Sequence, residues 1–213
     1  VMFSSYGDLL QTLESRLNQM CEDGKPRGSW NSGKRQAVDV PPQNWGAADG
    51  EALSAEELGT VCDAWYPVHA IGYNWLRSNG EAAKDVAQRI REIIAFYKNL
   101  KFDCGKVIVV THSMGGLVGR ALIHPDYGNA QDVVAGIVHG AMPAVGAAAA
   151  YRRIRVGFEG SGIKGYLVKK VLGDTGPKVT AVLANSPGGL QLLPSERYGS
   201  GWLKASVNGK EVL

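Results

Sequence analysis

The first 60 residues combine one amphipathic segment with a long stretch that has no hydrophobic period. Residues 8–20 carry apolar side chains at helical spacing, which predicts an amphipathic helix with Asp8 as its cap. The stretch from Cys21 to Thr60 is rich in Gly, Pro, Ser and Asn, and so long a loop is unusual inside a compact domain. We interpret residues 1–60 as an N-terminal helix and a long loop that forms a lid or an insertion.

The chain then changes to short apolar runs that alternate with helical patterns. Three runs rich in apolar residues predict buried strands, at 68–73, 106–110 and 133–139. Two segments with apolar side chains three and four positions apart predict helices, at 79–100 and 114–124. This alternation predicts a parallel sheet with right-handed crossovers, which binds ligands at the carboxyl ends of its strands. We interpret residues 61–146 as the core of the fold.

One of these strands runs into a serine among small residues, and a helix follows at once. The segment Thr111–Gly116 reads THSMGG. This is the pattern of a nucleophile elbow, a sharp strand-to-helix turn that presents a catalytic serine, here Ser113. The amide of Met114 then lies at the helix N-terminus, where it can donate a hydrogen bond to a developing oxyanion. The chain departs from the motif at Thr111, where the motif has glycine. The alternative interpretation is a buried strand that meets a glycine-rich turn and has no catalytic role.

A serine nucleophile needs a histidine and a carboxylate, and the sequence leaves both open. In hydrolases with this elbow, the acid and the histidine follow the serine. The chain has four histidines, at positions 69, 112, 124 and 139. His139 ends the next strand and is the least unfavourable candidate for the catalytic base. For the acid, Asp174 is the only aspartate after Asp132. No strand precedes the first helix to supply the second oxyanion donor, so we expect the chain to be an internal portion of a larger hydrolase. A complete enzyme with an unorthodox base is the alternative.

The last part of the chain, residues 147–213, predicts a helical cap and a connection to further core. Between Tyr151 and Leu172, six basic residues stand against one acid, Glu159. Apolar residues alternate with the lysines at roughly helical spacing. A basic cap segment of this kind can contact a membrane surface of anionic lipid. The other interpretation, which we favour, is the solvated face of an ordinary cap helix.

Length, composition and charge narrow the class of protein. The 213 residues, with 45% hydrophobic and 20% charged side chains, are typical of one soluble globular domain. The net charge of +3 is too small to argue for nucleic-acid binding. No apolar run approaches 18 residues, and no signal peptide is visible. The three cysteines are odd in number and widely spaced, at 21, 62 and 104, which predicts reduced thiols in a protein made in the cytoplasm and matches no metal spacing. The ester-hydrolase interpretation needs no metal and no cofactor.

The elbow and its two flanking segments resemble a particular group of lipases. The flanking segments are Gly72–Arg77, which reads GYNWLR, and Val138–Pro143, which reads VHGAMP. Over about residues 61–146 the chain resembles the lecithin:cholesterol acyltransferase and GPI-inositol-deacylase-like α/β-hydrolases. In that group a Tyr-Asp-Trp-Arg-like motif ends the strand before the elbow, and this chain has Asn74 in place of the aspartate. Among bacterial proteins, it is similar to lipase effectors of the type VI secretion system.

The resemblance implies an α/β-hydrolase fold with a mostly parallel sheet, flanking helices and a helical cap insertion, present here as an incomplete portion. It implies a serine ester hydrolase of lipase or phospholipase type, in which Ser113 forms an acyl-enzyme and the Met114 amide contributes to the oxyanion hole. Asn74, Trp75 and Met142 are expected to line the substrate pocket, and packing in the core is the alternative for Trp75. A lipid acyltransferase and a non-catalytic binding platform remain the alternatives.

The effector resemblance also implies partners and a location. We expect a lipid ester as the substrate, an immunity protein as a partner, and no nucleic acid. An effector of this kind is an antibacterial toxin that is made in the cytoplasm without a signal peptide. It is then secreted to act on the membrane lipids of the periplasm.

Overall fold

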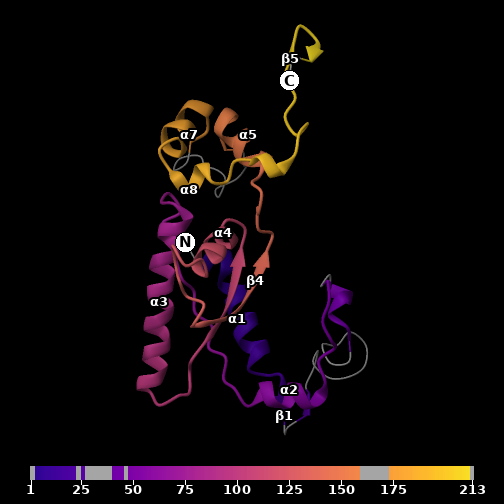
Figure 1. The fold of residues 1–213 in the computed structure, drawn as a ribbon, viewed down its shortest axis with the longest axis vertical. Coiled ribbons are helices and arrows are strands. Elements are labelled where there is room, and N and C mark those ends of the chain that lie inside the picture. Colours follow the sequence, from indigo (N-terminus) through magenta and orange to yellow (C-terminus); the bar gives the residue numbers. More distant parts are fainter. Residues whose placement is uncertain (1–2, 23–24, 27–39, 46–47, 159–172, 212–213) are drawn as a thin grey trace. The chain divides into compact units, whose positions relative to one another are not determined.

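The chain folds into two compact units, Val1–Ala70 and Ile71–Leu213 (Figure 1). The structure is a computed structural model that describes residues 3–22, 25–26, 40–45, 48–158 and 173–211. The predicted three-part division at residues 60 and 146 stays a prediction.

The first unit contains two helices and a short hairpin. Its elements are α1 (Phe3–Leu17), β1 (Cys21–Glu22), β2 (Lys25–Pro26), the 3-10 turn η2 (Pro42–Trp45) and α2 (Ala55–Cys62), with β1 and β2 antiparallel. The predicted amphipathic helix is confirmed, but it begins at Phe3 and Asp8 is not its cap. Residues 3–7 contain no proline, and an apolar period alone does not define where a helix starts.

Helix α2 lies in the stretch that the sequence analysis predicts as a loop, so that prediction was wrong for residues 55–60. The helix begins with a capping box, in which Ser54 Oγ accepts the Glu57 N–H at 3.1 Å and Glu57 Oε2 accepts the Ser54 N–H at 2.8 Å. Its apolar anchor, Leu58, is fully buried beside Met20. The lid or insertion stays a prediction, and residues 27–39 and 46–47 of it lie outside the described residues.

A disulfide joins Cys21 to Cys62, with an S–S distance of 2.10 Å, and Cys104 is free. The prediction of three reduced thiols was therefore wrong for two of them. Cysteine spacing along the sequence does not report proximity in space, and these two Cα atoms lie 6.0 Å apart although 41 positions separate them. Both cysteines pack against the small core of Met20 and Leu58.

The second unit is built around a short parallel sheet with helices on one face. In chain order its first elements are α3 (Asn79–Asn99), β3 (Val107–His112), α4 (Gly115–Leu122) and β4 (Val134–Gly140). Strands β3 and β4 are parallel, with Val110 opposite Val138 and Thr111 opposite His139. The four predicted elements at 79–100, 106–110, 114–124 and 133–139 are therefore confirmed.

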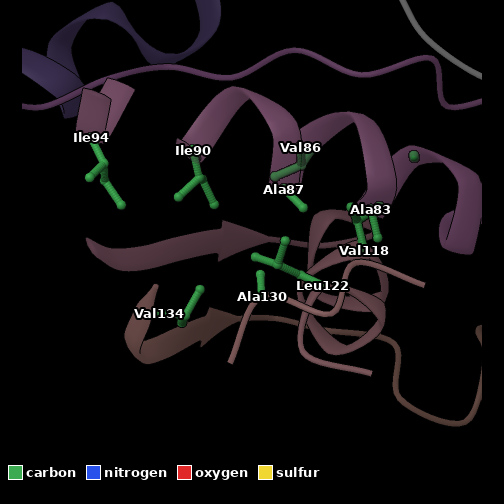
Figure 2. Packing of buried hydrophobic residues seen from close by; sticks show 10 residues of the cluster. Ala83, Val86, Ala87, Ile90, Ile94, Val118, Leu122, Ala130 and Val134 are labelled. Atoms are coloured by element: carbon green, nitrogen blue, oxygen red, sulfur yellow. The ribbon is translucent and has the colours of Figure 1, made fainter. Parts of the chain in front are cut away.

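One apolar cluster holds the sheet and its helices together. Figure 2 shows Val86, Ile90 and Ile94 of α3 pointing toward the strands and toward the side chains of α4. Leu122 of α4 is fully buried at the centre of the cluster. On the other face of the sheet, Ile108, Val110 and Val138 are each more than half exposed. Within the described residues of this unit, only one face of the sheet is therefore covered.

The segment 68–73 is not a strand, contrary to the sequence prediction, and has no regular secondary structure. Its side chains Ile71 and Tyr73 still pack against the main cluster. Alternating apolar residues report burial, whereas a strand also needs a neighbour that completes its hydrogen-bond ladder, and no described strand pairs with this segment. The prediction was therefore right about the core and wrong about the sheet.

The remaining elements follow β4. They are α5 (Ala148–Val156), α7 (Gly176–Leu183), α8 (Pro187–Leu190), the 3-10 turn η3 (Glu196–Tyr198) and the antiparallel pair β5 (Ser206–Val207) and β6 (Lys210–Glu211). Helices α5 and α7 pack so closely that Gly176 lies against the Arg155 carbonyl, where no larger side chain fits. Of the predicted basic cap segment, residues 159–172 lie outside the described residues. Its described part exposes Arg152, Arg153 and Arg155.

An ion pair ties α3 to the turn before β4. Arg91 donates two hydrogen bonds to the carboxylate of Asp132, at 2.7 and 3.0 Å, and a third to the Asn129 carbonyl at 3.0 Å. The hydrogen bonds from Arg91 hold the pKa of Asp132 below its ordinary value. The stability that this pair contributes is therefore fully present above the ordinary pKa of an aspartate. It is lost as the pH falls through the lowered value.

Replacing Arg91 with glutamine should raise the pKa of Asp132 to its ordinary range, because a neutral amide stabilises a carboxylate less than a guanidinium does. An NMR titration of the side-chain carboxyl carbons measures this directly. Arg89→Gln is the matched control, because Arg89 pairs with Glu92 and should leave Asp132 unchanged. An Asp132 pKa that is the same in Arg91→Gln as in the wild type would contradict the assignment.

Candidate active site

Ser113 stands at the sharp turn between β3 and α4. Its φ of 53° lies in the left-handed region, which side chains other than glycine rarely adopt. The turn is held by the neighbouring strand, since the Ser113 N–H donates to the Gly140 carbonyl of β4 at 2.8 Å. Ser113 is exposed. The strand, the turn and the helix expected of a nucleophile elbow are present, and the catalytic role of the serine stays a prediction.

The amide groups that follow Ser113 are available to bind a negative charge. Met114 has helical backbone angles and immediately precedes α4. The first N–H group of this turn that forms a backbone hydrogen bond after Ser113 is that of Gly116, which donates to the Ser113 carbonyl at 2.9 Å. Within the described residues, no group accepts a hydrogen bond from the N–H of Met114 or of Gly115. Unpaired N–H groups at a helix N-terminus favour anions, so this turn can stabilise an oxyanion.

Small residues let other parts of the chain approach the elbow closely. A Cβ atom at Gly116 would lie 2.5 Å from Met142 Cγ, so the Met142 side chain rests on the first turn of α4. Gly188 of α8 touches the Trp75 carbonyl, and a Cβ atom there would lie 2.9 Å from Met114 Cε. Two of the predicted pocket residues, Trp75 and Met142, are thereby placed beside the elbow. Their contact with a substrate stays a prediction.

Asn74, the third predicted pocket residue, takes part in a local turn. Its Oδ1 accepts the Leu76 N–H at 3.1 Å, and its carbonyl accepts the Arg77 N–H at 3.2 Å. These bonds explain an asparagine at this position without a ligand, because Asn readily closes such turns with its own side chain. The Asn74 side chain is nevertheless exposed, and its role in the pocket stays a prediction.

Thr111, the residue that departs from the elbow motif, holds the side chain of His139, the histidine considered as a base for Ser113. Thr111 Oγ1 lies 2.8 Å from His139 Nδ1 and donates to the Val138 carbonyl at 3.3 Å. His139 is thus fixed to the neighbouring strand, with a threonine as its described partner and no carboxylate. Asp174, the only aspartate after Asp132 in the sequence, forms an ion pair with Lys178 at 2.8 Å. The described residues therefore do not assemble a histidine and an acid on Ser113.

Two further properties concern the described residues as a whole. No group of three His, Cys, Asp or Glu side chains in them is arranged as a metal site requires. None of their helices has the length and the apolar character needed to cross a membrane.

The position of α8 beside the elbow was missed at the sequence level. The only local signal is the Pro-Gly-Gly run at 187–189, in which small residues permit the close contact of Gly188 with Trp75. Such a run is read as a turn when only its neighbours in the sequence are known.

Two known proteins or protein families are similar to this chain. The sequence profile of the PGAP1-like alpha/beta domain matches residues 78–162. In the crystal structure of the Tle4–Tli4 complex, one chain is similar over 92% of this chain, with a TM-score of 0.77 and 35% sequence identity. This chain spans 37% of that longer one, and no curated protein sequence matches it.

The match confirms the resemblance drawn from the elbow and its flanks. It also agrees with the observed geometry, since the matched residues 78–162 include both strands and the turn at Ser113. Residues 78–162 are therefore similar to the PGAP1-like alpha/beta domain, and the small parallel sheet and its helices form part of an α/β-hydrolase-like fold.

Proposed function

We propose that the protein is a serine ester hydrolase of lipase or phospholipase type, with Ser113 as its nucleophile. The observation that carries this proposal is the strained turn at Ser113, with φ at 53°, beside the amide of Met114, which has no acceptor among the described residues. Backbone strain of this kind persists only where the surrounding structure enforces it, and it clusters at functional sites. The hydroxyl and the oxyanion donor are the two groups that acyl transfer needs side by side.

The reaction proceeds in two steps. In the first, Ser113 Oγ attacks the ester carbonyl, a base takes the hydroxyl proton, and the Met114 amide stabilises the oxyanion. The alcohol then leaves with a proton, and an acyl-enzyme remains on Ser113. In the second step, water attacks the acyl-enzyme with the help of the same base, the carboxylic acid is released, and Ser113 regains its proton.

We propose that the histidine and the acid come from polypeptide outside the described residues. The similar chain is much longer than this one, which spans 37% of it. The described environment of His139, bonded to Thr111, supports a structural role for this histidine. The second oxyanion donor is likewise expected outside the described residues.

The substrate and the partners follow from the resemblance and from the surface of α5. We propose a lipid ester as the substrate, and the exposed arginines 152, 153 and 155 support contact with an anionic membrane surface. The similar Tle4 chain was crystallised in a complex with Tli4, which supports a cognate protein partner such as an immunity protein. The Cys21–Cys62 disulfide supports secretion into an oxidising compartment such as the periplasm, where an antibacterial effector would act.

A serine-reactive fluorophosphonate probe tests the proposal on the full-length protein. We expect the wild type to be labelled, Ser113→Ala to remain unlabelled, and the matched control Ser195→Ala to be labelled like the wild type. Ser195 is exposed as well, but it lies outside the elbow and donates to the Val145 carbonyl. Labelling that persists in Ser113→Ala would refute the nucleophile. An unlabelled wild type would favour a non-catalytic binding platform, and acyl transfer to an added alcohol in preference to water would favour an acyltransferase.

A further inference from the structure

Two residues other than glycine adopt left-handed backbone angles where the parallel strands end. Ser113 follows β3 with a φ of 53°, and Ala141 follows β4 with a φ of 51°. The last residues of the two strands, His112 and Gly140, lie opposite each other in the register. A side chain disfavours this conformation, so it persists only where neighbouring contacts enforce it. The carboxyl ends of both strands must therefore be held in place by specific interactions.

The side chain of Thr111 connects these two strand ends. It lies two positions before Ser113 and is half-buried. Its Oγ1 donates to the Val138 carbonyl at 3.3 Å and lies 2.8 Å from His139 Nδ1. Both partners belong to β4, in which the Gly140 carbonyl accepts the Ser113 N–H at 2.8 Å. The hydroxyl thus joins β3 to β4 immediately before the hydrogen bond that holds the turn.

The direction of these hydrogen bonds determines where the His139 ring carries its proton. A hydroxyl has one donor hydrogen and two acceptor lone pairs. Since the Thr111 hydrogen is donated to the Val138 carbonyl, the oxygen is the acceptor toward His139, and Nδ1 of the ring carries a hydrogen. In a neutral imidazole, Nε2 is then unprotonated. The bridge therefore runs from the His139 Nδ1–H to the Thr111 hydroxyl and from there to the Val138 carbonyl.

The same two side chains pack against α4, the helix that follows the elbow. A Cβ atom at Gly119 would lie 3.0 Å from Thr111 Cγ2 and 3.3 Å from His139 Cε1. A Cβ atom at Gly115 would lie 3.9 Å from Thr111 Cβ. The threonine and the histidine therefore lie between the strand ends and the first turns of α4. Their positions set the spacing between the sheet and this helix.

We infer that Thr111 is a positioning residue for the elbow and that it acts through His139. The inference rests on the proposed function, because the groups that it positions are the Ser113 hydroxyl and the Met114 amide. The bridge holds the ends of β3 and β4 together, and this hold maintains the left-handed turn at Ser113. The alternative is that Thr111 only fills space. Valine is branched like threonine but has no hydroxyl, so it separates the two roles.

The kinetics of labelling by a fluorophosphonate probe test this role on the full-length protein. In Thr111→Val the maximal rate should fall about tenfold or more, because a displaced nucleophile reacts slowly, while the half-saturating probe concentration stays unchanged. Thr111→Ser keeps the hydroxyl and should restore most of the rate. The matched control Thr60→Val removes a hydroxyl of α2 that donates to the Glu56 carbonyl, and it should react like the wild type. Equal maximal rates in Thr111→Val and the wild type would overturn the inference, as would a Thr111→Ser as slow as Thr111→Val.

Two NMR measurements do not depend on catalysis. At a pH where the ring is neutral, the ¹⁵N shifts of His139 should identify the Nδ1–H tautomer. The Nε2–H tautomer would overturn the inference, because Thr111 would then donate to the ring and not to Val138. Hydrogen exchange of the Ser113 amide should be at least tenfold faster in Thr111→Val than in Thr60→Val. Unchanged exchange would show that the hydroxyl does not hold the turn.

The outcomes separate this inference from the proposed function. An unlabelled wild type with the expected tautomer and exchange would refute the nucleophile and leave the bridge as the element that holds the turn. A labelled wild type with an equally fast Thr111→Val would keep the nucleophile and refute the positioning role. If Thr111→Val does not fold, His139→Phe keeps a ring against Gly119 and removes the donor of the bridge. It should slow labelling about tenfold, and an unchanged rate would overturn the inference.

Discussion

Ser113→Gly in the full-length protein is expected to lose at least a thousandfold of the proposed ester hydrolase activity while folding more stably than the wild type. The loss follows from removing the proposed nucleophile, without which only binding and oxyanion stabilisation remain. The gain follows from the φ of 53° at this residue. Glycine adopts this conformation freely, whereas a side chain destabilises it by about 1–2 kcal/mol. Part of the gain is offset by the greater freedom of glycine in the unfolded chain.

Ser113→Ala is the matched control, because it removes the hydroxyl and keeps a Cβ atom. It should be as inactive as Ser113→Gly and less stable than that variant by about 1 kcal/mol. Hydrolysis of a chromogenic ester measures the first effect, and urea-induced unfolding measures the second. Residual activity near the wild-type level in either variant would exclude Ser113 as the nucleophile. Equal stabilities of the two variants would show that the turn is not strained.

The parts of the fold that sequence analysis predicted correctly are those encoded by neighbouring residues. The run from Val107 to His112 is strongly β-branched, and small residues follow Ser113 at once, so strand, turn and helix could all be located. Helix α3 was equally clear, because Val86, Ile90 and Ile94 recur at helical spacing and form the buried face that the structure shows. For these elements, local propensity and tertiary packing agree.

The features that could not be predicted depend on contacts between distant residues. Residues 68–73 have the apolar pattern of a strand, but no described strand pairs with them. Gly188 reaches the elbow from more than 70 positions away, and nothing in its own surroundings indicates Trp75 or Met114 as neighbours. The capping box at Ser54 is different, because its Ser-x-x-Glu signal was visible in a stretch that composition alone indicated as a loop.

For the candidate site, the sequence locates the elbow, and the roles of its residues stay predictions. The serine and its amide neighbour lie in one continuous segment, and a motif locates them. The histidine and the acid of a hydrolase are brought to the serine by the fold, so their positions cannot be read from spacing. Thr111 illustrates the limit, since the sequence marks it only as a departure from glycine. The structure shows that its hydroxyl fixes His139 on the neighbouring strand.

Reduction of the Cys21–Cys62 disulfide is expected to destabilise the first unit by about 4 kcal/mol, because the cross-link closes a loop of roughly 40 residues and restricts the unfolded chain. Denaturant unfolding with and without dithiothreitol measures the difference, and hydrogen exchange in α2 locates it, since α2 ends at Cys62. The paired variant Cys21→Ser/Cys62→Ser should behave like the reduced protein under both conditions.

Cys104→Ser serves as the matched control for this experiment, because Cys104 is the free thiol and packs against the core of the second unit. This variant should keep its sensitivity to dithiothreitol, whereas the paired variant should lose it. Protein exported to an oxidising compartment should also resist unfolding more than protein retained in the cytoplasm, because only the former forms the cross-link. Identical unfolding curves for oxidised and reduced wild type would show that the disulfide does not stabilise this unit. The support that it gives to an oxidising site of action would then be lost.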